Sequence, residues 1–174
     1  MKKTTLPRIV LYLVAIALFH VLSGMEEKSD SLKNIIETTE VDTTKAKALN
    51  RLGWMILYAN PDSAKLLSLQ ALEIAERSNF KSQIAKSYAN LGGYYTVTNE
   101  LDSALIYFSK ALTIRIQIGE ESGIANSYND VGLTYLSLAN YPMALDNFFK
   151  SLKIDATLGN KLNIADGYTN IGKI

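Results

Sequence analysis

Few residues of this 174-residue chain could carry covalent, acid–base or metal chemistry. His20 is the only histidine, and cysteine is absent. Histidine-based triads, thiol nucleophiles and the common zinc sites therefore lack their residues. No GxxxxGK[ST] or GxGxxG phosphate-binding loop occurs, and Leu91-Gly92-Gly93 lies inside a helical pattern and not after a strand. The sequence predicts a protein that is not an enzyme and that holds no cofactor and no metal.

Charged residues do not point to catalysis or to nucleic acid. Glu120 and Glu121 form an adjacent acidic pair, but they fall in a predicted link between helices, where solvated surface is the usual explanation. The formal charge is +1, and it changes to about −2 without the first 24 residues, which hold three cations and no acid. This balance lacks the positive field that a phosphate backbone requires, so we expect no nucleic-acid partner.

One polar series remains as a candidate binding constellation. Asn90, Asp130 and Asn170 recur at intervals of 40 residues, each one position before a Leu-Gly, Val-Gly or Ile-Gly pair. A side-chain amide both donates and accepts hydrogen bonds, which suits contact with a peptide backbone. Alternatively, these residues hydrogen-bond the adjacent repeat. Both interpretations stay open at this point.

The repeat that positions this series extends over most of the chain. Residues 84–92 return as 124–132 and 164–172, and a weaker copy occupies 45–53. Within one unit, two sets of residues recur at the intervals of three, four, seven or eight residues that place side chains on one helix face. The first set is Tyr88, Leu91, Gly92 and Tyr95, and the second is Ala104, Phe108, Ala111 and Leu112. Each unit is therefore predicted to hold two helices.

Helix-breaking residues separate the two helices and then the units. Asn60-Pro61 and Asn140-Tyr141-Pro142 fit the start of the second helix, where Asn caps and Pro occupies the first turn. Asn79, Gly119 and Gly159 fit its end, where a left-handed residue is favoured. One hairpin cannot bury both its faces, so we expect an all-α, right-handed solenoid with units at about 45–82, 83–122, 123–162 and 163–174.

This pattern resembles the tetratricopeptide repeat, whose motif positions are matched by Tyr88, Leu91, Gly92, Tyr95, Ala104, Phe108 and Ala111. The first unit departs from the motif with Leu49 and Ser68, and the period of 40 exceeds the family's usual one. The resemblance implies a protein or peptide partner in the concave groove of the first helices. It places these residues in that groove: Asn90, Asp130, Asn170, Asn129, Trp54, Tyr58 and Leu133. For Trp54, packing between repeats is the favoured role.

A second function is implied by the same resemblance. Similar arrays with 40-residue repeats look like the sensory N-terminal parts of bacterial histidine kinases, nucleotide cyclases and transcriptional regulators. The fourth unit begins near Leu162 and reaches Ile174 without a second helix. We therefore expect a fragment of a longer protein, which contacts a membrane only through its N-terminal segment or a downstream region.

The N-terminal 24 residues have the layout of a secretory signal peptide. Lys2, Lys3 and Arg8 precede an apolar run of about 14 residues, which ends at the small pair Ser23-Gly24. The run is shorter than the roughly 20 residues that span a bilayer, so cleavage is favoured over a permanent anchor. We expect export to the periplasm or cell envelope.

Residues 25–44 stand between this segment and the first unit. Residues 30–36 are predicted to form a short helix that covers the exposed face of the first hairpin. Asp42, Thr43 and Thr44 are predicted to cap the helix that follows.

Overall fold

The computed structural model describes residues 8–174, so Lys2 and Lys3 of the predicted signal lie outside the described residues. Regular structure within 8–174 consists of eight helices. They are α1 (Arg8–Thr38), α2 (Asp42–Ile56), α3 (Pro61–Arg77), α4 (Lys81–Val97), α5 (Leu101–Ile118), α6 (Glu121–Ser137), α7 (Tyr141–Leu158) and α8 (Lys161–Ile171).

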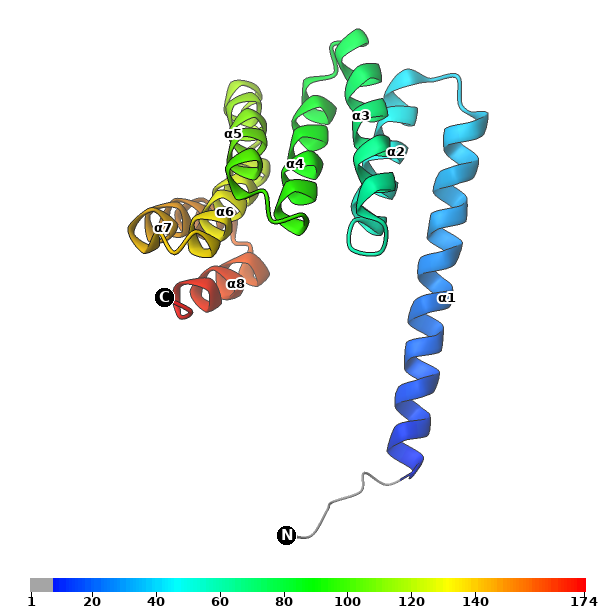
Figure 1. Ribbon diagram of the computed structural model, residues 1–174, viewed down its shortest axis with the longest axis horizontal. Coiled ribbons are helices and arrows are strands. Elements are labelled where there is room, and N and C mark those ends of the chain that lie inside the picture. The colour runs from blue at the N-terminus through cyan, green and yellow to red at the C-terminus, as the bar shows by residue number, and fades with distance from the viewer. Residues whose placement is uncertain (1–7) are drawn as a thin grey trace.

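The helices pair in sequence order and the pairs stack (Figure 1). Helices α2 and α3, α4 and α5, and α6 and α7 form three antiparallel hairpins, and each hairpin packs mainly against the next one. Helix α8 packs on α7 at the C-terminal end. The predicted all-α solenoid of stacked hairpins is confirmed.

Asparagine caps begin two of the second helices. The Asn60 Oδ1 atom accepts a hydrogen bond from the Ser63 N–H at 3.1 Å, and Pro61 is the first residue of α3. The Asn140 Oδ1 atom accepts from the Met143 N–H at 3.4 Å at the start of α7. These bonds satisfy amide groups that have no partner inside the helix. The capping prediction for both turns is confirmed.

Left-handed residues end the second helices. Gly119 and Gly159 both have φ of 68°, and Asn79 has φ of 49°. Glycine adopts this region without a steric penalty, and asparagine tolerates it. Three chain reversals, 40 residues apart, are therefore built from local backbone chemistry.

The predicted cap of α2 is wrong. Helix α2 begins at Asp42, its N-cap is Val41, and no side chain of the described residues caps it. The Asp42 carboxylate instead accepts hydrogen bonds from Arg77 Nη2 at 3.1 and 3.2 Å and from Ser78 Oγ at 3.3 Å. A tertiary ion pair with the end of α3 therefore takes the carboxylate away from the helix start.

In the second and third hairpins, a glycine of the first helix faces a phenylalanine of the second helix. A Cβ atom on Gly92 would lie 2.6 Å from the Phe108 ring, and one on Gly132 would lie 2.6 Å from the Phe148 ring. Any side chain at either glycine would displace the ring. The repeated glycine and phenylalanine positions therefore allow the two helices of a hairpin to pack closely.

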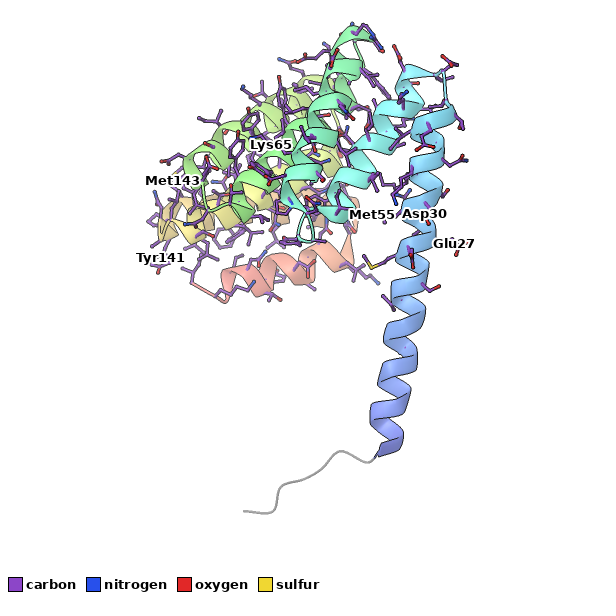
Figure 2. The ribbon with its side chains drawn as sticks, turned by 45° about the vertical axis from the view of Figure 1, so that its right-hand side comes forward. Glu27, Asp30, Met55, Lys65, Tyr141 and Met143 are labelled. Carbon is purple, nitrogen blue, oxygen red and sulfur yellow. The ribbon has the colours of Figure 1, made fainter. Side chains whose placement is uncertain are left out.

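Helix α1 is a single element of 31 residues. Its C-terminal part packs on the first hairpin, where Leu32 is buried against Ala48 and Leu52 of α2. Its N-terminal part extends away from the array (Figures 1 and 2). The cover over the first hairpin is thus the end of a long helix, where the sequence indicated a short separate one. Among residues 8–174, no helix has both the length and the apolar character to span a bilayer.

Candidate partner-binding groove

Two adjoining clefts lie on the first helices of the three hairpins. The polar cleft has a volume of about 370 Å³ and is lined by Trp54, Lys86, Ala89, Asn90, Arg115, Asn126, Asn129 and Asp130. The apolar cleft has a volume of about 150 Å³ and is lined by Trp54, Leu57, Tyr58, Gly93, Thr96, Phe108, Asp130, Leu133 and Thr134. Because Trp54 and Asp130 line both clefts, the clefts form one continuous inner groove.

Six of the seven residues that the sequence placed in a groove line this inner groove. They are Trp54, Tyr58, Asn90, Asn129, Asp130 and Leu133. Asn170, on α8, lines neither cleft. The helical period therefore brings residues from α2, α4 and α6 to one surface.

The aromatic residues of the groove are open to solvent. Trp54 is 54% exposed, and Tyr58, just beyond the end of α2, is 81% exposed. The Trp54 indole lies beside Gly93 of α4, where an added Cβ would be 3.5 Å from its Cζ3 atom. Trp54 thus contacts the next repeat, as the favoured packing role requires, and still presents more than half of its surface to a partner.

Asn90 is used between repeats. Its Nδ2 atom donates to the backbone oxygen of Asn50 at 2.8 Å, and only 6% of the residue is exposed. Asn50, which is fully buried, also accepts from Ser87 Oγ at 3.0 Å and donates to Gln83 Oε1 at 3.1 Å. This network joins α2 to α4 and fixes their spacing. The Asn90 amide N–H₂ group therefore hydrogen-bonds the adjacent repeat, which was one of the two roles that the sequence left open.

Asn170 and Asn129 repeat this arrangement at the other end of the array. Asn170 Nδ2 donates to Asn129 Oδ1 at 3.0 Å, which joins α8 to α6. Lys173 Nζ donates to Asn170 Oδ1 at 2.8 Å. Both polar ends of the Asn170 amide are therefore engaged within the protein.

Asp130 is the exception in this series. Asn90 and Asn170 donate to an asparagine 40 or 41 residues earlier, and Ala89 stands 41 residues before Asp130. Alanine has no polar side chain, and the Asp130 carboxylate accepts no hydrogen bond from residues 8–174. Desolvation raises the pKa of Asp130 to about 7, and the positive charge of Arg115 only partly opposes that shift. The inner groove therefore holds a half-buried carboxyl that is about half ionised at neutral pH.

Arg115 reaches the polar cleft from α5. It is 8% exposed, and its Nη1 atom donates to the Gly123 carbonyl oxygen at 3.0 Å and to Ser127 Oγ at 2.7 Å. Its Nε atom has no hydrogen-bond partner in the described part of the chain. Burial lowers the pKa of Arg115, and the negative charges of Glu120 and Asp130 oppose this shift. The buried guanidinium group ties α5 to α6.

Sequence reasoning missed Arg115, Lys86 and Asn126 as groove residues. A signal for Arg115 was present, because it extends the buried face of its helix by one turn beyond Ala111. The equivalent residues of the other hairpins, Ala75 and Asp155, are also buried. A charged residue at a core position is uncommon and marks a site with a specific partner.

Residues 83–157 match the tetratricopeptide repeat family. Among solved structures, the crystal structure of BtubC (BKLC) from P. vanneervenii is similar with a TM-score of 0.63 and 18% sequence identity. The match covers 83% of this chain and 64% of BtubC, so the chain spans less than two thirds of the length of BtubC. At this identity the likeness shows the fold alone. A comparison with curated proteins found no match.

Residues 83–157 are tetratricopeptide repeats, and the stacked hairpins of α2 to α7 have the helical-repeat fold that accompanies them. Repeats of this class generally mediate protein–protein interaction, and the family is typically a scaffold without catalytic activity.

Proposed function

We propose that this chain is a binding module whose inner groove receives a peptide or helix of a partner protein. The observation that carries the proposal is the pair of exposed aromatic residues, Trp54 and Tyr58, beside the half-buried carboxyl of Asp130. Tryptophan and tyrosine side chains in well-packed pockets supply much of the binding energy at protein interfaces. A peptide covering them would remove apolar surface from water.

The groove suits this role because buried hydrogen bonds join the helices that form its walls. The buried bonds of Asn50 with Asn90 and Ser87 hold α2 against α4, and the bonds of Arg115 hold α5 against α6. A preformed groove spends little of the interaction free energy on its own ordering when the partner binds. Binding alone, without a chemical step, is the proposed mechanism.

Selection of peptides from a displayed random library on the full chain tests this function. We expect selected peptides to bind saturably, and Trp54→Ala to weaken their binding by about thirtyfold or more, since a central aromatic residue is typically worth about 2 kcal/mol or more. The matched control is Ile106→Ala, because Ile106 is 56% exposed but lies on a different surface, with Leu105 and Lys110 of α5. Unchanged binding to Trp54→Ala, together with lost binding to Ile106→Ala, would place the partner elsewhere.

We also propose that the chain is exported to the periplasm or cell envelope. The residues of α1 that pack on α2, namely Leu32, Ile35 and Ile36, all follow the proposed cleavage site near Ser23 and Gly24. Removal of residues 1–24 would therefore leave the cover of the first hairpin in place. Within the sensory alternative, the same inner groove would be the ligand-binding surface.

A further inference from the structure

The apolar cleft has an unusual composition for a purely hydrophobic binding site. Its walls include Trp54, Leu57 and Leu133, and Asp130 is the one charged residue among those that line it. A hydrophobic side chain of a partner would cover this carboxyl without pairing it. Covering an ionised group without a partner is unfavourable in proteins, so a purely apolar occupant does not suit the cleft.

The protein itself does not neutralise Asp130. The positive charge of Arg115 acts on Asp130, but the two residues form no ion pair within 4.0 Å among the described residues, and the Arg115 Nη1 atom donates to Gly123 and Ser127. The preceding repeat offers only Ala89 at the position where Asn90 and Asn170 find an asparagine. The Asp130 carboxylate is therefore available to pair with a cation of a partner molecule.

We propose that the apolar cleft binds a lysine or arginine side chain of the partner, with its aliphatic stem between Trp54 and Leu133 and its cation against the Asp130 carboxylate. This inference rests on the proposed function of the inner groove and names the partner's chemistry there. Long basic side chains bury their methylene groups against apolar walls while the charged end finds a polar partner. The exposed Trp54 ring adds a favourable face for the same cation.

The other charges of the groove set the direction from which the cation arrives. Lys86 of α4 and Arg115 of α5 line the polar cleft on the other side of Asp130, and α2 contributes no charged residue to either cleft. A partner cation is repelled on the polar side and is accepted through the apolar cleft. Lys86 and Arg115 together would favour an acidic group, which is the competing outcome of the test.

Proton linkage gives the binding a defined pH dependence. A cation binds the ionised carboxylate and lowers the pKa of Asp130, which is about 7 in the free protein. Binding is therefore accompanied by proton release at neutral pH. About a tenth of the groups are ionised at pH 6 and about nine tenths at pH 8, so affinity rises by up to about ninefold across this interval.

Fluorescence titration tests the proposal, because Trp54 is the single tryptophan of the chain. The probes are three acetylated and amidated pentapeptides of alanine with lysine, norleucine or glutamate at the centre, titrated into the full chain at pH 6 and pH 8. At pH 8 we expect the lysine peptide to bind about tenfold tighter than the norleucine peptide, and we expect this preference to shrink at pH 6. Asp130→Asn should abolish the preference. Asp102→Asn should keep it, because Asp102 is exposed on α5 and lines neither cleft.

Each other outcome overturns the proposal in a distinguishable way. Equal affinity for the lysine and norleucine peptides, with no effect of Asp130→Asn, would show that the apolar cleft does not select a basic side chain. The inner groove would then stay a peptide-binding site without this preference. Preference for the glutamate peptide would assign the groove to an acidic group at Lys86 and Arg115. No change of Trp54 fluorescence with any probe would also overturn it, and the library-selected peptides would then show whether the proposed function fails with it.

Discussion

Replacing Phe148 by alanine is expected to lower the free energy of unfolding by about 3–5 kcal/mol. Phe148 has 0% exposure in α7, and its ring packs against Gly132 in the first helix of the same hairpin. Glycine offers no side chain that could move to fill the space, so the cavity stays open. Urea denaturation followed by circular dichroism measures the loss.

The neighbouring residue supplies a matched control for this substitution. Phe149 is 55% exposed, so Phe149→Ala removes the same atoms from the surface of the same helix. We expect a change of no more than about 0.5 kcal/mol. Similar losses for the two variants would contradict the packing of α7 that the structure gives.

Replacing Asp130 by asparagine is expected to stabilise the protein above neutral pH. Desolvation raises the pKa of this carboxyl from 3.8 to about 7 in the folded protein. Between these two values the unfolded chain releases a proton that the folded chain keeps, so the free energy of unfolding falls as pH rises from about 4 to about 7. Asparagine cannot ionise, so the variant lacks this loss. The carboxyl is only half-buried, and we expect a gain of about 1–3 kcal/mol at pH 8.

Urea denaturation at pH 4, 6 and 8 measures this effect. The difference between Asp130→Asn and the unsubstituted chain should be near zero at pH 4 and should grow with pH. Asp102→Asn, which removes an exposed carboxylate from α5, should show no such growth. Parallel pH profiles for Asp130→Asn and the unsubstituted chain would show that the carboxyl is not desolvated.

The Phe148→Ala and Asp130→Asn variants distinguish a residue that stabilises the repeat scaffold from a residue of the candidate binding site. Phe148 belongs to the repeating core, which every hairpin needs, whereas Asp130 interrupts a repeating polar contact and costs stability at neutral pH. A local conflict of this kind inside an otherwise consistent repeat is a mark of a functional position. The loss of stability at Asp130 is the counterpart of the affinity that we propose for a partner's cation.

The architecture could be predicted because it depends on local signals that recur. The caps of Asn60 and Asn140 and the left-handed Gly119 and Gly159 each follow from the backbone chemistry of one turn. The 40-residue period then fixes which faces meet, since every hairpin must bury the same stripe. The same period brought Trp54, Asn90 and Asp130 to one surface.

The hydrogen-bond partners could not be predicted from the repeat. Whether the Asn90 amide faces a ligand or Asn50 depends on the distance between neighbouring repeats, which the sequence period does not set. Asp42 has the chemistry of a cap, but its carboxylate is closer to Arg77, 35 residues away. The role of Arg115 depends on how deeply α5 packs against α6. Each of these outcomes is decided by tertiary distances.

The solvent exposure of Trp54 tests the central claim most directly. Acrylamide quenching of its fluorescence can be measured for the free chain and for the chain saturated with a library-selected peptide. Because Trp54 is 54% exposed and lines both clefts, we predict strong quenching in the free protein and clear protection in the complex. A peptide that binds by calorimetry and leaves the quenching of Trp54 unchanged would contradict the inner groove as the partner-binding surface.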